Sequence, residues 1–332
     1  MLALRWIAGR LGAAALVAWV VATVVFFALR GAGGDPTEAI LGGPGSQAGP
    51  EAVAAVRTEY GLDEPVLVQY LFQLWRVATF QLGDSYARRQ PVSDLIGGQL
   101  PATLILAGAA LALAWVLALL IATAAVSARG RVGRLAVSVL RGVEIAASVL
   151  PHFWFGAVLI ALFAVSLGWL PATSTSSAPS ALVLPTITLA VPVAGFLGQV
   201  MRDGLAEAHT APFATTSRAR GASEQWVLVR HSLRHAALPA IALSGWAFGS
   251  LLSGAVVVET LFGRPGLGRL LMEATTGQDV PLVIGSVLVV ALGYVVVMTL
   301  ADLAEWVLDP RLRAGSASRR ARTPQTDTAV GG

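Results

Sequence analysis

Residues 212–239 read PFATTSRARGASEQWVLVRHSLRHAALP, and they separate two long apolar runs of the chain. Four arginines fall within this short polar stretch, at Arg218, Arg220, Arg230 and Arg234. About twenty apolar residues are enough for a helix to cross the roughly 30 Å hydrocarbon layer of a bilayer, and both flanking runs reach that length. The pattern therefore predicts two membrane spans joined by a polar loop.

The composition supports a membrane protein and excludes several other classes. Hydrophobic residues make up 55% of the 332 residues, charged residues 13%, and the mean hydropathy is +0.71, whereas about a quarter of the residues of a soluble domain are charged. Every basic residue is arginine, so the chain lacks the lysine with which a P-loop holds nucleotide phosphates. The net charge of +4 fits arginine-rich loops beside anionic lipid better than nucleic-acid binding. Without cysteine, the chain has neither disulfides nor thiolate metal sites.

Hydropathy predicts an all-α protein with six membrane spans. Residues 144 to 202 enclose a stretch without Asp, Glu, Lys or Arg that is too long for one helix, and residues 168–180, with prolines and a Ser/Thr cluster, supply a break. The predicted spans are residues 6–29, 100–126, 143–167, 181–200, 236–258 and 280–307. The first run could instead be a signal peptide, but its length and the lack of a clear cleavage site favour a retained helix.

The distribution of arginine predicts the orientation. With the N-terminus in the cytoplasm, only seven of the 23 arginines fall in outside segments and 16 fall inside. Because cytoplasmic loops of membrane proteins are enriched in basic residues, both termini are expected in the cytoplasm. The polar loop at 212–239 then also lies in the cytoplasm.

This arrangement divides the chain into four expected parts. Residues 1–30 form the first membrane helix, and residues 31–99 form an extracytoplasmic segment with helical patterning at 51–60 and 66–80. Residues 100–310 form a five-helix core that includes a cytoplasmic loop at 204–235. Residues 311–332 are rich in Ser, Arg, Thr and Gly without periodicity, which predicts a disordered tail.

Several strings, taken in order, resemble one known family. In the polar loop these are small residues followed by Arg218, Gly221, His231, Leu233, Arg234 and Pro239, an order that resembles the "EAA" loop of the membrane subunits of ABC importers. Elsewhere the chain reads GDP at 34–36, YGLDEP at 60–65, LPAT at 100–103, ETLF at 259–262, PGLGR at 265–269 and DPR at 309–311. Together these strings resemble permeases of the dipeptide/oligopeptide/nickel branch, and the long segment after the first span resembles its "B" subunit.

The resemblance implies the transmembrane domain of a type I ABC importer in the bacterial inner membrane, carrying peptides or similar small solutes. It also implies a second, homologous permease, two ATP-binding subunits and an extracytoplasmic solute-binding protein. ATP and Mg²⁺ would bind to the ATPase subunits, so the chain itself is expected to be neither an enzyme nor a holder of a cofactor or metal. Pro212, Thr215 and His235 depart from the residues common in the family's loop.

The loop is predicted to be an ATPase-docking site in which a short helix sits in a groove of the partner. Phe213 would offer an apolar contact, the arginines would offer charge-assisted contacts, and Gly221 would let the chain reverse after the helix. The predicted docking residues are Phe213, Thr216, Arg218, Ala219, Arg220, Gly221, His231, Leu233, Arg234 and Pro239. The alternative is a solvated basic loop that only obeys the positive-inside rule.

Charged groups within spans are candidates for function because burying them in lipid is costly. They are Glu144, Glu259, Asp302 and Glu305, for which structural roles are favoured over a place in the transport pathway; Asp302 and Glu305 could pair with Arg311 or Arg313. His231 and His235 have the spacing of a helical metal pair, but they lack the intervening Glu of a metalloprotease motif and lie in the predicted docking loop.

Two rival functions remain to be compared. An ion-coupled secondary transporter would also have many spans and buried carboxylates, but it leaves the loop at 212–239 unexplained. An intramembrane serine protease would need a histidine in reach of Ser244.

Overall fold

The computed structural model describes residues 2–31, 37, 40, 41, 48–128, 130–176 and 178–308. Over these residues the protein is helical, and its extended pairing is limited to a bridge between Asp84 and Pro91. The α-helices are α1 (Leu2–Gly31), α3 (Pro50–Glu59), α4 (Val66–Ala78), α5 (Val92–Ser127), α6 (Gly130–Ser148), α7 (His152–Leu159), α8 (Ser180–Thr210), α9 (Pro212–Ala219), α10 (Glu224–Val227), α11 (Leu233–Leu261), α12 (Leu267–Thr276) and α13 (Val280–Leu308). Two segments, η1 (Ile160–Ser166) and η2 (Leu228–Ser232), are π-helical.

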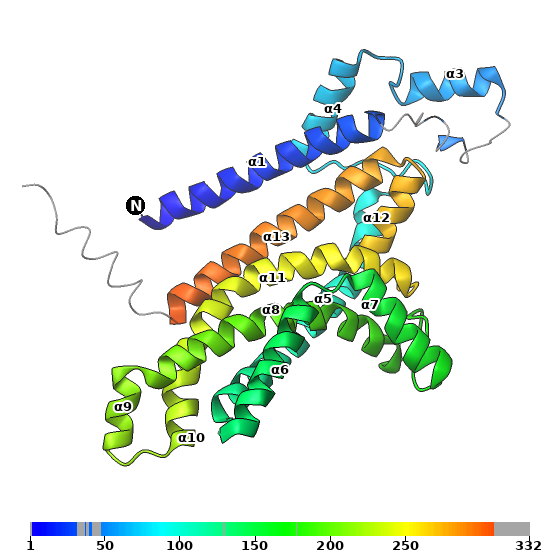
Figure 1. Cartoon of the computed structure of the whole chain (residues 1–332). Helices are drawn as coiled ribbons and strands as arrows, with labels where there is room; N and C mark the ends of the chain where they lie inside the picture. The colour runs from blue at the N-terminus through cyan, green and yellow to red at the C-terminus, as the bar shows by residue number, and fades with distance from the viewer. Residues whose placement is uncertain are drawn as a thin grey trace, which may run out of the picture.

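Five of the predicted spans correspond to helices that are long and apolar enough to cross a membrane. Among the described residues these are Trp6–Gly31, Val92–Ser127, Ser180–Thr210, Glu224–Leu261 and Val280–Ala304. Of these, α1, α13, α11 and α8 run roughly side by side through the molecule (Figure 1).

The third predicted span, residues 143–167, is not one straight helix. It falls on two helical stretches, Gly130–Ser148 and His152–Ser166, which meet at an angle of 109° and make a sixth span only if counted together. Pro151 has no backbone N–H and disfavours the helical conformation of the residue before it, so the helix ends there and the chain turns. The sequence indicated a kinked span here, with the kink at Pro151, but it did not indicate a turn as large as 109°.

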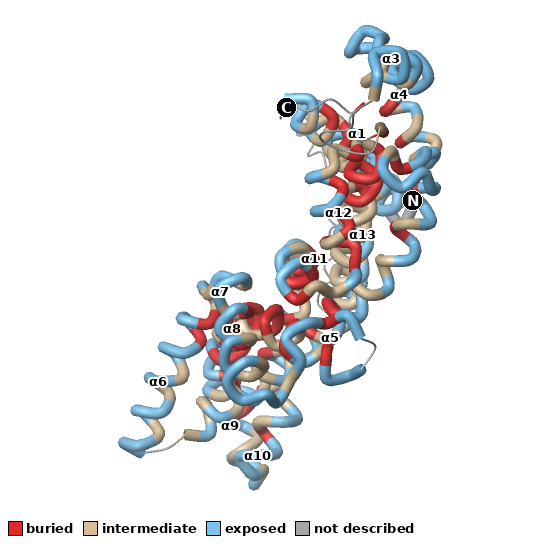
Figure 2. Tube along the Cα trace, turned by 90° about the vertical axis from the view of Figure 1, so that its right-hand side faces the viewer, coloured by how far each residue is buried: buried red, intermediate tan, exposed pale blue. Residues whose placement is uncertain are grey.

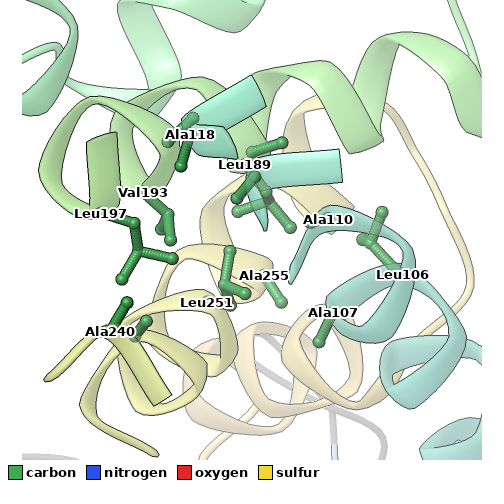
Figure 3. Close-up of a cluster of buried hydrophobic side chains, with 14 of the residues drawn as sticks. Leu106, Ala107, Ala110, Ala118, Leu189, Val193, Leu197, Ala240, Leu251 and Ala255 are labelled. Carbon is green, nitrogen blue, oxygen red and sulfur yellow. The ribbon is translucent and has the colours of Figure 1, made fainter. Parts of the chain in front are cut away.

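The packed core lies around α8. Leu189, Val193 and Leu197 of α8 meet side chains of α5 and α11 (Figure 3), and buried positions gather in the middle of the bundle while α3 and α6 stay largely exposed (Figure 2). The face of α5 that belongs to this core repeats alanine every four residues, at 110, 114, 118 and 122, and each of these alanines is fully buried. Such small residues let helix backbones approach closely, which is how helices associate in lipid.

Gly195 shows how close this approach is on the side of α8 that packs against α6. A Cβ atom at this position would lie 2.6 Å from the carbonyl oxygen of Glu144 and 2.8 Å from the amide nitrogen of Ser148. Both are backbone atoms that cannot move out of the way by a side-chain rotation. Gly195 therefore fixes the contact between α6 and α8.

Gly195→Ala is expected to lower the free energy of unfolding by about 1–3 kcal/mol, because overpacking forces the two backbones apart. Thermal unfolding of the purified protein in detergent measures this as a lower melting temperature. The matched control is Gly108→Ala in α5, where a new Cβ would have no atom within 4 Å. Equal melting temperatures for the two variants would contradict the tight α6–α8 contact.

Candidate functional site

The polar loop forms a short helical hairpin that projects from the end of the bundle. After α8 ends at Thr210, α9 begins with Pro212 in its first turn, where the missing N–H costs nothing. The chain then turns and returns through α10 and η2 into α11. In Figures 1 and 2 this hairpin lies at the opposite end of the molecule from α3 and α4, as the predicted orientation requires.

Aromatic and imidazole rings pack α9 against the returning chain. The ring of Phe213 lies 4.7 Å from that of His235 and 6.3 Å from that of His231, measured between centroids, and the ring of Trp226 lies 4.8 Å from His231. Ala214, the next residue of α9, is fully buried. The two histidines whose spacing could suggest a metal pair are therefore part of a ring cluster that holds α9 in place.

Glu224 joins the two arms of the hairpin by ion pairs. One carboxylate oxygen lies 3.0 Å from Nε of Arg218, and the other lies 3.0 Å from Nε2 of His209 at the end of α8. Arg218 is thus half-buried and engaged within its own chain. This pairing gives Arg218 a part in positioning α9, and its contact to a partner stays a prediction.

The turn between the arms depends on Gly221. Its φ is +89°, a conformation that glycine adopts at little cost and that side chains with a Cβ disfavour. Its amide donates to the carbonyl of Arg218 at 2.9 Å, and the amide of Ala222 donates to that of Ser217 at 3.1 Å, so the last carbonyls of α9 are satisfied. The sequence predicted this reversal.

The other predicted docking residues fall into two groups. Exposed on the hairpin and at the start of α11 are Phe213, Thr216, Ala219, Arg220, Arg234 and Pro239. Leu233 is half-buried and packs against the main core. The hairpin therefore leaves the Arg220 guanidinium, just after α9, and part of the Phe213 side chain exposed for contact with another protein.

The hairpin leads directly into one long helical rod. Residues Glu224–Leu261 form a continuous helical stretch of 38 residues, which corresponds to about 57 Å at 1.5 Å per residue. Pro239 lies inside it, just beyond the π-helical turn η2. The hairpin and the far end of the bundle are thus connected by helix throughout.

Glu259 lies at the other end of this rod, fully buried, where it binds α12 and α5. Its carboxylate accepts hydrogen bonds from the Thr103 hydroxyl at 2.5 Å and from the backbone amides of Gly268 and Arg269 at 2.8 and 3.2 Å. The Thr103 oxygen also accepts from the amide of Leu267 at 2.8 Å. The structure therefore gives Glu259 a clear structural role: it caps α12 and ties three helices together.

The remaining membrane carboxylates also have protein partners. Glu144 of α6 is almost fully buried and pairs with Arg202 of α8. Asp302 of α13 pairs with Arg10 of α1; the proposed partners Arg311 and Arg313, and the Glu305 side chain, lie outside the described residues. Each pair links two different helices.

Sequence reasoning missed the partners Thr103, Arg202 and Arg10. Glu144 and Arg202 are the two charged residues at the ends of a long uncharged stretch. Because they have opposite charges within apolar segments, the sequence could have suggested that they pair. Nothing in the local sequence around Thr103 indicated a contact with a residue more than 150 positions away.

The structure does not bring together the residues of two other sites, a serine protease site at Ser244 and a metal site. The Ser244 hydroxyl accepts from the Trp115 indole at 2.9 Å and donates to the Ala240 carbonyl at 2.8 Å, an arrangement that gives no nucleophile–histidine pair. In the part of the chain that the structure describes, no three His, Cys, Asp or Glu side chains are grouped as metal ligands.

The described residues form a bundle of apolar helices with a compact helical hairpin between two spans, an arrangement that fits a membrane-embedded subunit of a transporter. The chain belongs to the family of binding-protein-dependent transport system inner membrane components, whose pattern matches residues 116–314, and residues 3–107 match the N-terminal part of such membrane components. It is thus a permease subunit of the inner membrane and does not itself catalyse a reaction.

Known proteins are similar in sequence to this chain over nearly its whole length. A protein of Brucella abortus (strain 2308), provisionally named a peptide transport system permease protein, is 34% identical over 314 residues, covering 92% of this chain and 97% of the relative. The glutathione transport system permease protein of Salmonella typhimurium is 32% identical over 296 residues, covering 89% and 94%. A crystal structure of an amino acid ABC transporter with histidines shares the fold, with a TM-score of 0.50 and 17% identity over 64% of this chain and 94% of that chain.

Thr103→Val is expected to destabilise the protein by about 1–3 kcal/mol, because the buried amide of Leu267 loses its acceptor and Glu259 loses a donor. The control is Thr260→Val, an exposed threonine whose hydroxyl bonds only to the carbonyl of Val256 in its own helix. Melting temperatures in detergent distinguish the two. A Thr103→Val protein as stable as the control would refute the role of this contact.

Proposed function

We propose that this chain is one of two similar transmembrane subunits of an ATP-driven importer for short peptides or related small solutes. Relatives named for peptide and glutathione transport support this substrate class, since glutathione is itself a tripeptide. The proposed assembly also contains two ATP-binding subunits and an extracytoplasmic solute-binding protein. ATP and Mg²⁺ bind to the ATPase subunits in this proposal, and the chain takes no cofactor.

The observation that carries the proposal is the α9 hairpin. The hairpin is fixed to α8 and α11 by the contact between the rings of Phe213 and His235 and by the ion pairs of Glu224. Arg220 remains exposed, and part of the Phe213 side chain is exposed as well. A short amphipathic helix can lie in a hydrophobic groove of another protein and add charge-assisted contacts at its edge. A solvated loop that served only the orientation of the chain would not need so many internal contacts.

In the proposed mechanism, ATP binding brings the two ATPase subunits together and moves α9 in each permease. Because α9 is packed against the start of α11, this movement biases the spans between inward-open and outward-open states. Linkage requires the reverse effect as well, so substrate delivery from outside alters nucleotide binding inside. The ion-coupled alternative is weakened further because Glu144, Glu259 and Asp302 are each bound by protein groups.

Charge reversal at Arg220 tests the docking surface. Arg220→Glu is expected to weaken binding of the ATPase by about 2 kcal/mol or more, because an attractive contact becomes repulsive. The measurement is co-purification of the ATPase with the tagged chain in mild detergent. Arg134→Glu on α6 is the matched control, an exposed arginine on the same predicted side and outside the hairpin. Loss of the ATPase from both variants, or from neither, would contradict a specific role for Arg220.

Gly221→Val tests the turn. A β-branched residue is strained at a φ of +89°, so transport is expected to be lost while the protein still inserts in the membrane. Gly221→Asn is the companion variant, because asparagine tolerates positive φ better than other residues, and it is expected to retain more transport. Uptake of a labelled peptide by cells, normalised to the amount of membrane-inserted protein, measures both. Full uptake with valine would show that the turn geometry is not required.

A further inference from the structure

Helix α4 presents an apolar surface to the outside of the molecule. Leu67, Leu71, Phe72 and Trp75 are 67, 55, 63 and 66% exposed, respectively. At 100° per residue these positions share one side of the helix, and neighbouring Val68 is exposed as well. A contiguous apolar surface of this kind is unfavourable in water and marks contact with a partner or a membrane.

The polar side of the same helix faces the protein. Gln69, Gln73 and Arg76 line a partly open cavity of about 900 Å³ bounded by α1, α3 and the loop at 84–86, and Val68 and Phe72 at the boundary of the two sides of α4 also line it. Gln69 donates to the carbonyls of Leu62 and Glu64 and accepts from Arg30 at the end of α1. A helix of a water-exposed cap would have the opposite arrangement, with its polar side outward.

The contacts of α4 place it beside the membrane-spanning part of its neighbours. The Tyr70 hydroxyl lies 2.8 Å from that of Thr23 in α1, and Val77 shares a buried cluster with Ala22 of α1 and with Leu288 of α13. Thr23 precedes the end of α1 at Gly31 by eight residues, which is about 12 Å along the helix. Figure 1 shows α4 beside this end of α1.

The length of α1 shows that Ala22 and Thr23, which α4 contacts, lie within the hydrocarbon layer. The apolar stretch Trp6–Gly31 has 26 residues, or about 39 Å, which exceeds the roughly 30 Å hydrocarbon layer by about six residues. Even if all the excess projected beyond the bilayer at the Gly31 end, Ala22 and Thr23 would remain inside the layer. The residues of α4 that touch them are therefore at membrane depth.

The exposed surface of α4 is also continuous with the exposed surface of α1. Val24 and Phe27 are 59 and 50% exposed, and the ring of Phe27 lies 5.5 Å from that of Tyr70. An exposed apolar surface on a spanning helix faces the acyl chains of the lipid. Because the apolar side of α4 adjoins this surface of α1, it faces the same acyl chains. Tryptophan such as Trp75 is enriched where the hydrocarbon layer meets the headgroups.

We propose that α4 is a membrane-embedded helix that lies in the leaflet next to the C-terminal end of α1. Leu67, Leu71 and Trp75 contact lipid acyl chains, while Gln69, Gln73 and Arg76 keep their polar groups on the cavity, and Phe72 lies between the two sides. The segment between the first two spans is thus in part a lipid-contacting element.

The absence of cysteine from the sequence makes a direct test possible. Leu71→Cys and Trp75→Cys each receive one nitroxide label in the chain purified with its co-purifying subunits and reconstituted in phospholipid nanodiscs. Val24→Cys on α1 is the lipid reference, and Glu51→Cys, exposed on α3, is the water reference. Power-saturation spectroscopy compares collisions with oxygen, which partitions into lipid, and with a water-soluble nickel chelate.

Labels at Leu71→Cys and Trp75→Cys are expected to show oxygen-to-nickel collision ratios close to that of Val24→Cys and several-fold above that of Glu51→Cys. A ratio like that of Glu51→Cys would place α4 in water and overturn the proposal. Low collision rates with both reagents would mean that another protein, such as a second permease, covers this face, and would overturn it as well. Either position alone is informative if the other variant fails to insert.

Discussion

Close contact between helix backbones is the constraint on which the other features depend. Lipid chains are as apolar as leucine, so burying apolar side chains gives little drive for helices to associate within the bilayer, and association relies on packing and on polar contacts. The alanines on one side of α5 and Gly195 on α8 provide the packing. Because α8 ends at Thr210 and α9 begins at Pro212, the position of the hairpin follows from the position of this central helix.

A few carboxylates within the spans add polar contacts between helices to this packing. Glu144, Glu259 and Asp302 each join helices that are distant in sequence. An isolated carboxylate in lipid would be costly, so each is retained together with a group that compensates it. Removing one partner of such a contact costs more than the contact itself contributes, because the other group is left buried and unpaired. These residues therefore determine which helices are neighbours.

Much of the fold could be predicted from the sequence, because apolar length and arginine placement act locally. The spans and the turn at Gly221 follow from that information. Pro151 indicated a kink in the third span, but not a turn of 109°, because hydropathy measures apolar length and a proline does not fix the angle of the bend. The partner of Glu259 was missed because Thr103 is brought there only by tertiary packing. For the hairpin, the sequence did not distinguish one arginine from another as a partner contact. The pairing of Arg218 with Glu224 depends on how the two arms fold back.

The rod Glu224–Leu261 gives the protein a mechanical property. Its near end is clamped to α9 by Phe213 and His235, and its far end is clamped to α12 through Glu259. A helix resists stretching, so an axial push on the hairpin is delivered almost undiminished to α12 on the opposite surface. Bending is easier near Pro239, where one backbone hydrogen bond is missing. The π-helical segment η2 is a second place where the helix can bend. Both places lie near the hairpin, so the stretch from Pro239 to Leu261 is the part of this element best suited to carry a displacement from one face of the membrane to the other.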